Sequence, residues 1–240
     1  QTAGPPARTS ASKVSPSTFR ERDNVANHVT QGAVTRLATR TGTRTEADIQ
    51  TDIQTVLVSG DLNLDPNDVP KLEEPTGDGT RRRVDVSICH AVIEVKKNLS
   101  NRGARVAAEA QLAGYLKTKH AQHDRRFVGI LTDGIDWLLY DYLDDGTADG
   151  AVVEVARLAN DGDADRLVVW LEAILVSDTG IKPTPTEIEQ RLGATSPGHL
   201  LDFRELSVIY EANKTNPEVA VKRDLWAKLL KTAFGSAFED

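Results

Sequence analysis

The sequence predicts a mixed α/β fold, in which a central β-sheet is flanked by helices and followed by a helical extension. Strand-like runs rich in valine and isoleucine alternate with helical patterns up to about residue 160. Only helical patterns follow, and a run of strands before a run of helices indicates an appended helical region. A chain of 240 residues is long enough for one large domain with such an extension.

The first part of the chain predicts an arm and two helices. Residues 1–16 are rich in proline, serine and other small residues, so a flexible arm is expected there. Apolar residues near helical spacing predict a helix within 17–40. Thr45 followed by Asp48 is typical of a capping box, and a second helix is expected to begin there. The segment 59–80 carries turn signals and could include a short strand.

The sheet is expected in the middle of the chain. β-rich residues concentrate in five runs, and a long helical pattern lies between the second run and the third. The expected strands are 82–88, 91–97, 127–131, 137–143 and 152–158, and the expected helix is 102–119. The predicted division is an arm at 1–16, a main domain at 17–160 and a helical extension or connector at 161–240.

The composition favours a soluble, cytoplasmic protein without a membrane-spanning segment. Hydrophobic residues make up 39% of the chain and charged residues 27%. No apolar run approaches the roughly 20 residues that a bilayer requires. The single cysteine, Cys89, excludes an internal disulfide and a thiolate cluster for zinc. Because methionine is absent even at position 1, the chain is expected to be processed, cut or engineered at its start, or to be part of a longer polypeptide.

Charge is distributed unevenly along the chain. The formal net charge is -7, yet residues 81–126 contain 11 Lys or Arg against four acids. A basic segment that also carries acids is expected at a site that handles phosphodiesters. The alternative is a solvated basic helix face.

Three charged side chains in the predicted strands form a candidate active site. Glu94 and Lys96 are two residues apart and therefore emerge on one face of a strand, and Asp85 joins them if the two strands pair. Magnesium prefers oxygen ligands, so Asp85, Glu94 and the Val95 carbonyl are expected to bind it. Lys96 would orient or deprotonate the attacking water and stabilise charge that develops on a phosphate. The chemistry expected is Mg²⁺-dependent phosphodiester hydrolysis.

The spacing D-x8-E-x-K on adjacent strands resembles the PD-(D/E)XK, or restriction-endonuclease-like, nuclease superfamily, over roughly residues 45–142. Val84 precedes Asp85 where the family motif has proline. The resemblance implies a restriction-endonuclease-like fold, DNA as the substrate, and Mg²⁺ as the cofactor, with Mn²⁺ able to substitute. It also implies that Glu46, on the helix before the sheet, completes the metal site.

Three further segments carry the resemblance. Gln111 and Tyr115 are similar to the glutamine and tyrosine of RecB-type nucleases, and their spacing puts both on one helical face. Residues 128–142, VGILTDGIDWLLYDY, look like a hairpin in the nuclease domains of restriction-modification enzymes, and 216–235 resemble the helical connector that follows. This implies the amino-terminal part of a larger enzyme with an adenine-specific methyltransferase domain, although the chain contains no methyltransferase motif. Candidates for DNA phosphate contacts are Lys97, Arg102, Arg105 and Lys117.

Each candidate also has a structural interpretation. Glu94 and Lys96 could form a cross-strand ion pair, and Glu46 could stabilise a helix through its dipole. Gln111 and Tyr115 could belong to an exposed polar stripe. The alternative functions are a DNA repair or junction-resolving nuclease, and a catalytically inactive domain that only binds DNA or docks a partner.

Overall fold

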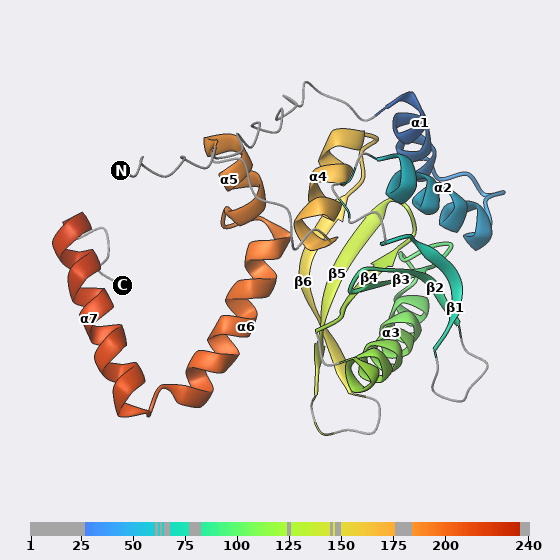
Figure 1. The fold of residues 1–240 in the computed structure, drawn as a ribbon. Helices are drawn as coiled ribbons and strands as arrows, with labels where there is room; N and C mark the ends of the chain where they lie inside the picture. The colour runs from blue at the N-terminus through green and yellow to red at the C-terminus, as the bar shows by residue number, and fades with distance from the viewer. Residues whose placement is uncertain are drawn as a thin grey trace, which may run out of the picture.

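The computed structural model describes residues 27–60, 62, 64, 68–76, 83–123, 126–144, 146, 150–175 and 184–235. These residues form a six-stranded mixed sheet with flanking helices, followed by C-terminal helices (Figure 1). The predicted mixed α/β class, with a sheet between helices and a helical extension, is confirmed. The predicted arm at 1–16 lies outside the described residues, as does the first part of the helix expected within 17–40.

The six strands follow one another across the sheet in chain order. They are β1 (Lys71–Pro75), β2 (Arg83–Ile88), β3 (Ala91–Val95), β4 (Val128–Thr132), β5 (Asp136–Leu143) and β6 (Ala151–Ala159). Only the pair β3–β4 is parallel, since helix α3 (Arg102–Gln122) provides the crossover between them. β1 is the short strand that the sequence allowed within 59–80. β3 ends at Val95, two residues earlier than predicted.

Two hydrophobic cores cover the two faces of the sheet. Side chains alternate along β3, so Ile93 packs beneath α1, α2 and α4, while Val92 packs beneath α3. Glu94 is the next residue after Ile93 and therefore shares the face of Val92. The active-site candidates thus lie on the α3 face, close to where β3 ends.

Helices α1 (His28–Leu37) and α2 (Glu46–Ser59) are fixed by their caps. The predicted capping box is present, because the Thr45 side chain accepts from the Asp48 N–H and the Asp48 carboxylate accepts from the Thr45 N–H. α1 begins after Asn27, whose side chain accepts from two backbone N–H groups. Asn27 itself has an extended backbone, as is usual for an N-cap residue.

Helix α4 (Ala164–Leu175) packs into the core beneath the sheet and also contacts the helices that follow, through Leu201 of α6 and an ion pair between Glu172 and Arg191 of α5. Its Leu167 and Leu171 are buried in the core shared with α1 and α2, and Trp170 lies edge-to-face on Trp137 of β5. A helical pattern in the sequence does not specify its packing partner. α4 therefore belongs to the core and also contacts α6, and the division of the chain at residue 161 stays a prediction.

Helices α5 (Pro185–Leu192), α6 (Pro197–Asn213) and α7 (Pro217–Phe234) complete the described chain. α6 is anchored to the sheet by ion pairs of Arg126 with Glu205 and of Arg204 with Asp141. α6 and α7 diverge from their connection and carry exposed apolar side chains, including Phe203 and Trp226 (Figure 1). Within the described residues, every helix is too short or too polar to cross a bilayer.

Candidate active site

Strands β2 and β3 separate at the candidate site. Their last antiparallel pair joins Val86 and Ile93, and Asp85 and Glu94 are the next residues on the two strands. At this point the Val95 backbone N–H donates a 2.7 Å hydrogen bond to Oδ2 of Asp85. The Asp85 carboxylate therefore accepts the hydrogen bond that a backbone carbonyl would accept in a regular ladder. Asp85 is held beside the end of β3, as expected if the two strands pair.

Glu94 is a buried acid whose hydrogen bonds are incomplete. Its residue is 0% exposed, and one carboxylate oxygen, Oε1, accepts from Nζ of Lys96. The other oxygen, Oε2, is buried without a hydrogen-bond partner among the described residues. An unsatisfied buried polar group costs about 1–3 kcal/mol, and more when it is charged. Such groups are few in native structures, and among their explanations are a catalytic role, a bound ion and an ordered water.

Both acids have a raised pKa, mainly because they are buried. Burial is the main cause that raises the pKa of Glu94 to about 7, and the charge of Asp85 adds to it. The hydrogen bond and charge of Lys96 lower this pKa but do not outweigh burial. Burial also raises the pKa of Asp85. The site is therefore short of positive charge, which favours the uptake of a cation or a proton.

Lys96 lies at the boundary between the buried acids and the solvent. Its side chain is 23% exposed, and its backbone N–H donates to the Thr132 carbonyl at 2.9 Å, just beyond the end of β3. Burial lowers the pKa of the ammonium, but the hydrogen bond and charge of Glu94 outweigh burial and raise it above its usual value. In this state Lys96 is a fixed cation that can stabilise developing negative charge.

Glu46 is brought to the rim of the same site. It is the first residue of α2, it is exposed, and its Oε1 accepts a 3.0 Å hydrogen bond from the Lys97 backbone N–H. Its charge contributes to the raised pKa of both Asp85 and Glu94, after burial and closer charges. Glu46 therefore connects α2 to the residue after Lys96, and it stands near the two acids without direct contact.

Gln111 and Tyr115 form a brace on α3. Gln111 Nε2 donates to the Tyr115 hydroxyl at 2.6 Å, and this hydroxyl donates to the Arg83 carbonyl at 2.7 Å. Burial, reinforced by the charges of Glu94 and Asp85, raises the pKa of Tyr115. The pair is thus near the acids, as expected, and its hydrogen bonds hold β2 two residues before Asp85 rather than pointing to an open site.

The four candidates for phosphate contacts do not share one surface. Lys97 is exposed and lines a pocket beside Lys96, and Arg102 is exposed at the start of α3. Arg105 pairs with Glu109 and Glu154, and its hydrogen bond to Tyr140 turns it toward β5. Lys117 lies 15 residues beyond Arg102, about 22 Å along the helix at 1.5 Å per residue. Of the four, Lys97 is the one that lines the same pocket as Lys96 and Glu46.

The residues present fit a magnesium ion in part. Within the described residues, no group of three or more His, Cys, Asp or Glu is arranged to hold a metal. Magnesium, however, keeps several waters and needs only one or two carboxylates from the protein. The unpartnered Oε2 of Glu94 beside Asp85 supplies that minimum, and the Val95 carbonyl could add a third oxygen.

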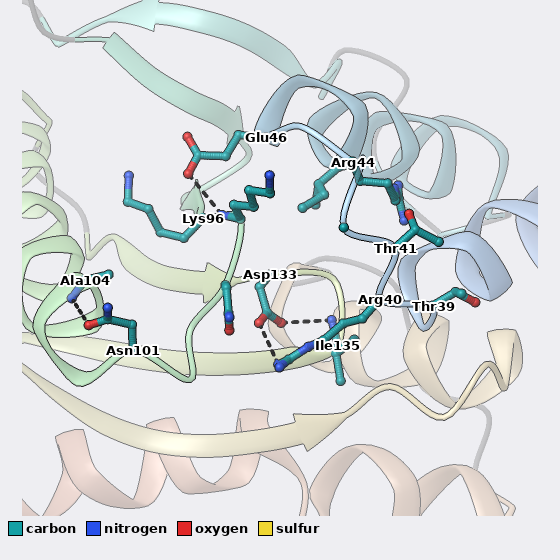
Figure 2. A pocket seen from close by; sticks show the side chains of 14 residues that line it. Thr39, Arg40, Thr41, Arg44, Glu46, Lys96, Asn101, Ala104, Asp133 and Ile135 are labelled. Carbon is teal, nitrogen blue, oxygen red and sulfur yellow. Dashed lines mark hydrogen bonds and ion pairs between the residues drawn. The ribbon is translucent and has the colours of Figure 1, made fainter.

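A pocket of about 440 Å³ opens next to Lys96 (Figure 2). The α1–α2 loop, the start of α2, the β3–α3 loop and the β4–β5 turn form its walls. Among its lining residues are Arg40, Arg44, Glu46, Lys96, Lys97, Asn98, Asn101 and Asp133. Sequence reasoning assigned no role to Arg40, Asn98, Asn101 or Asp133. Asp133 falls in the TDG turn of the resemblance, whereas no sequence signal separates Arg40 from its neighbours.

Comparisons with protein-family models, with curated proteins and with solved structures gave no match. The resemblance to PD-(D/E)XK nucleases therefore stays a prediction from the motif. The case for a function depends on the geometry of Asp85, Glu94 and Lys96.

Proposed function

We propose that this chain is a Mg²⁺-dependent DNA endonuclease domain that hydrolyses phosphodiester bonds. The observation that carries the proposal is the buried, unpartnered Oε2 of Glu94, which lies beside a second carboxylate and a lysine where two strands separate. A purely structural Glu–Lys pair would be expected to satisfy both oxygens. One open oxygen in a cation-poor site favours a metal ligand instead.

The residues divide the chemistry among them. Glu94, Asp85 and the Val95 carbonyl would hold Mg²⁺, which when bound polarises a phosphate and lowers the pKa of a water. Lys96 points its ammonium at Glu94 and remains partly exposed, so it can orient the water and stabilise negative charge on the phosphate. Glu46 fixes the backbone after Lys96 through the Lys97 N–H. Tyr115 and Gln111 fix β2 next to Asp85.

DNA is the proposed substrate because cationic side chains line the pocket next to Lys96. Arg40, Lys96 and Lys97 all line this pocket, and Lys96 connects it to Glu94 through their ion pair. Backbone phosphates are recognised by such groups without regard to sequence. In this proposal the chain is the nuclease part of a restriction-modification enzyme, with a methyltransferase domain elsewhere in the polypeptide. Mn²⁺ is expected to replace Mg²⁺.

The test is cleavage of supercoiled plasmid and linear duplex with Mg²⁺, Mn²⁺ or EDTA. Glu94→Gln and Lys96→Gln are expected to reduce the Mg²⁺-dependent cleavage rate by at least about a hundredfold. The matched controls are Glu74→Gln and Lys119→Gln, which alter a second Glu–Lys pair outside the site. These controls are expected to cleave like the unaltered protein.

The outcomes separate the alternatives. Equal cleavage by the Glu94 and control variants would exclude this site. Cleavage of branched or single-stranded DNA in preference to duplex would favour a repair or junction-resolving nuclease. DNA binding without metal uptake or cleavage would favour the inactive binding domain.

A further inference from the structure

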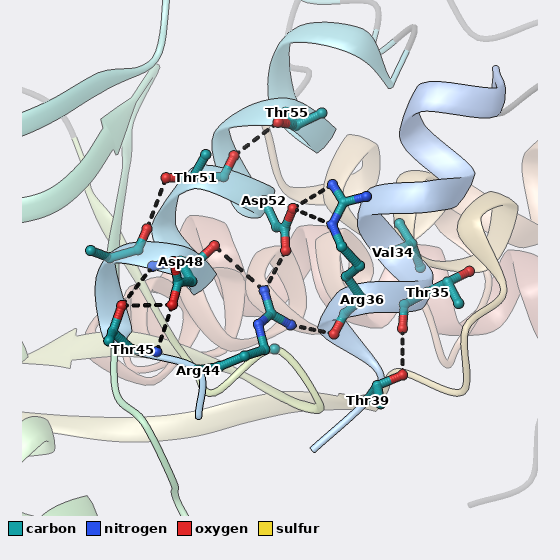
Figure 3. A network of polar contacts seen from close by, with 12 residues as sticks. Val34, Thr35, Arg36, Thr39, Arg44, Thr45, Asp48, Thr51, Asp52 and Thr55 are labelled. Carbon is teal, nitrogen blue, oxygen red and sulfur yellow. Dashed lines mark hydrogen bonds and ion pairs between the residues drawn. The ribbon is translucent and has the colours of Figure 1, made fainter. Parts of the chain in front are cut away.

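Three arginines spaced four residues apart surround the α1–α2 loop, and two of them have structural roles. Arg36 donates to Oδ1 of Asp52 through Nε at 2.9 Å and Nη2 at 2.5 Å (Figure 3). Arg44 binds the other oxygen of Asp52 and the Arg36 carbonyl. Both oxygens of Asp52 are thus satisfied, and the loop is closed against α2.

Arg40 differs from both because it extends to the pocket side of the loop (Figure 2). Its Nη1 donates to Ser100 Oγ at 2.9 Å and its Nη2 donates to Asp133 Oδ2 at 3.1 Å. Asp136 lies farther away, with its Oδ2 4.0 Å from Nη2. A guanidinium has five N–H donors, and the side chain of Arg40 remains 49% exposed. Donors are therefore left for a ligand in the pocket.

Asp133 fixes the orientation of Arg40. Its side chain is 1% exposed, and its Oδ2 also accepts from the Leu99 N–H at 3.0 Å. Its Oδ1 accepts from the N–H groups of Ile135 and Asp136. One buried carboxylate thus joins the β4–β5 turn, the loop after Lys96 and the α1–α2 loop. A cation held in this way loses little side-chain entropy on binding a ligand.

We propose that Arg40 binds a phosphate of the nucleic-acid strand that flanks the phosphate to be cleaved, and that Asp133 is its positioning residue. The inference rests on the proposed function, since Lys96 and Arg40 line one pocket and would contact the same strand. Its ligand chemistry is a phosphate diester, for which the planar fork of an arginine is suited. Arg40 is thereby a substrate-binding group that the sequence motif does not contain.

The test measures DNA binding apart from cleavage. The affinity of a fluorescently labelled duplex is measured by anisotropy in EDTA at several salt concentrations, with the full chain. Arg40→Gln is expected to raise Kd about tenfold and to reduce the slope of log Kd against log salt by about one. Arg40→Lys is expected to keep the salt slope and recover part of the affinity. The matched control is Arg166→Gln, because Arg166 is 53% exposed, pairs with one carboxylate and lies outside the pocket.

Cleavage in Mg²⁺ gives the second measurement. Arg40→Gln and Asp133→Asn are expected to raise KM with little change in kcat, provided that their melting temperatures show a folded protein. An unchanged Kd and salt slope for Arg40→Gln, with normal cleavage, would overturn this inference alone. Arg40-dependent binding without cleavage in any metal would overturn the proposed function and support the phosphate site.

Discussion

Two Glu–Lys pairs lie on the α3 side of the sheet, and they differ in how completely the acid is bonded. Glu74 of β1 accepts from Lys119 at 3.0 Å through Oε2, while Lys71 lies 3.5 Å from Oε1. Glu94 of β3 has Lys96 on one oxygen, and its other oxygen has no partner in the part of the chain that the structure describes. The same two residue types therefore form a satisfied ion pair in one place and an open ligand in the other.

The ionisation of the two acids shows the same contrast. Burial by itself would raise the pKa of Glu74, but hydrogen bonds from Lys119 and Ser87 outweigh it and lower that pKa. At Glu94, burial and the charge of Asp85 prevail over Lys96 and raise the pKa to about 7. The fold thus gains stability from one pair and loses stability to the other when both acids are charged. A lysine partner alone does not identify a structural ion pair.

The largest stability effect is expected at Glu94 in the metal-free protein. The pKa of Glu94 rises from 4.5 in the unfolded chain to about 7, so the folded state binds the extra proton between these values. Stability is therefore lost as pH rises through this window. Glu94→Gln removes the loss, and the free energy of unfolding at pH 8 is expected to increase by up to about 3 kcal/mol at 1.36 kcal/mol per pKa unit.

Urea unfolding in EDTA at several pH values checks this effect. The difference between Glu94→Gln and the unaltered protein should be small near pH 5, grow up to about pH 8 and then level off. A difference that is independent of pH, or a destabilised variant at pH 8, would contradict the raised pKa.

A smaller effect of opposite sign is expected at Glu74. Because the pKa of Glu74 is lowered in the folded protein, its charge contributes stability above the unfolded pKa, and this contribution is lost as pH falls through the folded pKa. Glu74→Gln is expected to lower the free energy of unfolding at pH 8 by about 1 kcal/mol, since the pair is partly exposed to solvent. The same denaturation series measures it. A stabilised variant would show that the two pairs do not differ as described.

Much of the fold could be predicted because its strands are β-rich runs separated by turns. The observed bounds of β2, β4, β5 and β6 lie within one residue of those expected. The sequence left β1 as a possibility without predicting it, because Lys71–Pro75 is short and polar. In the structure this strand is mostly exposed, and Glu73 has a φ of 51°. The packing of α4 was not predicted, since an apolar helical pattern indicates burial without naming the partner.

The candidate site was predictable where it depends on strand parity. Glu94 and Lys96 are two residues apart, and Asp85 lies on the neighbouring strand, so local sequence brings these three together. Arg40 and Asp133 are 93 residues apart, and their contact depends on tertiary structure. The same limit applies to Arg105. Its positive charge predicted a contact with DNA, but in the structure it forms ion pairs with Glu109 and Glu154.

Calorimetric titration of Mg²⁺ into the full chain at pH 8 tests the central claim most directly. The unaltered protein and Glu74→Gln are expected to bind one metal site, and Glu94→Gln is expected to bind none. Equal uptake of Mg²⁺ by Glu94→Gln and the unaltered protein would contradict the assignment of the open carboxylate as a metal ligand.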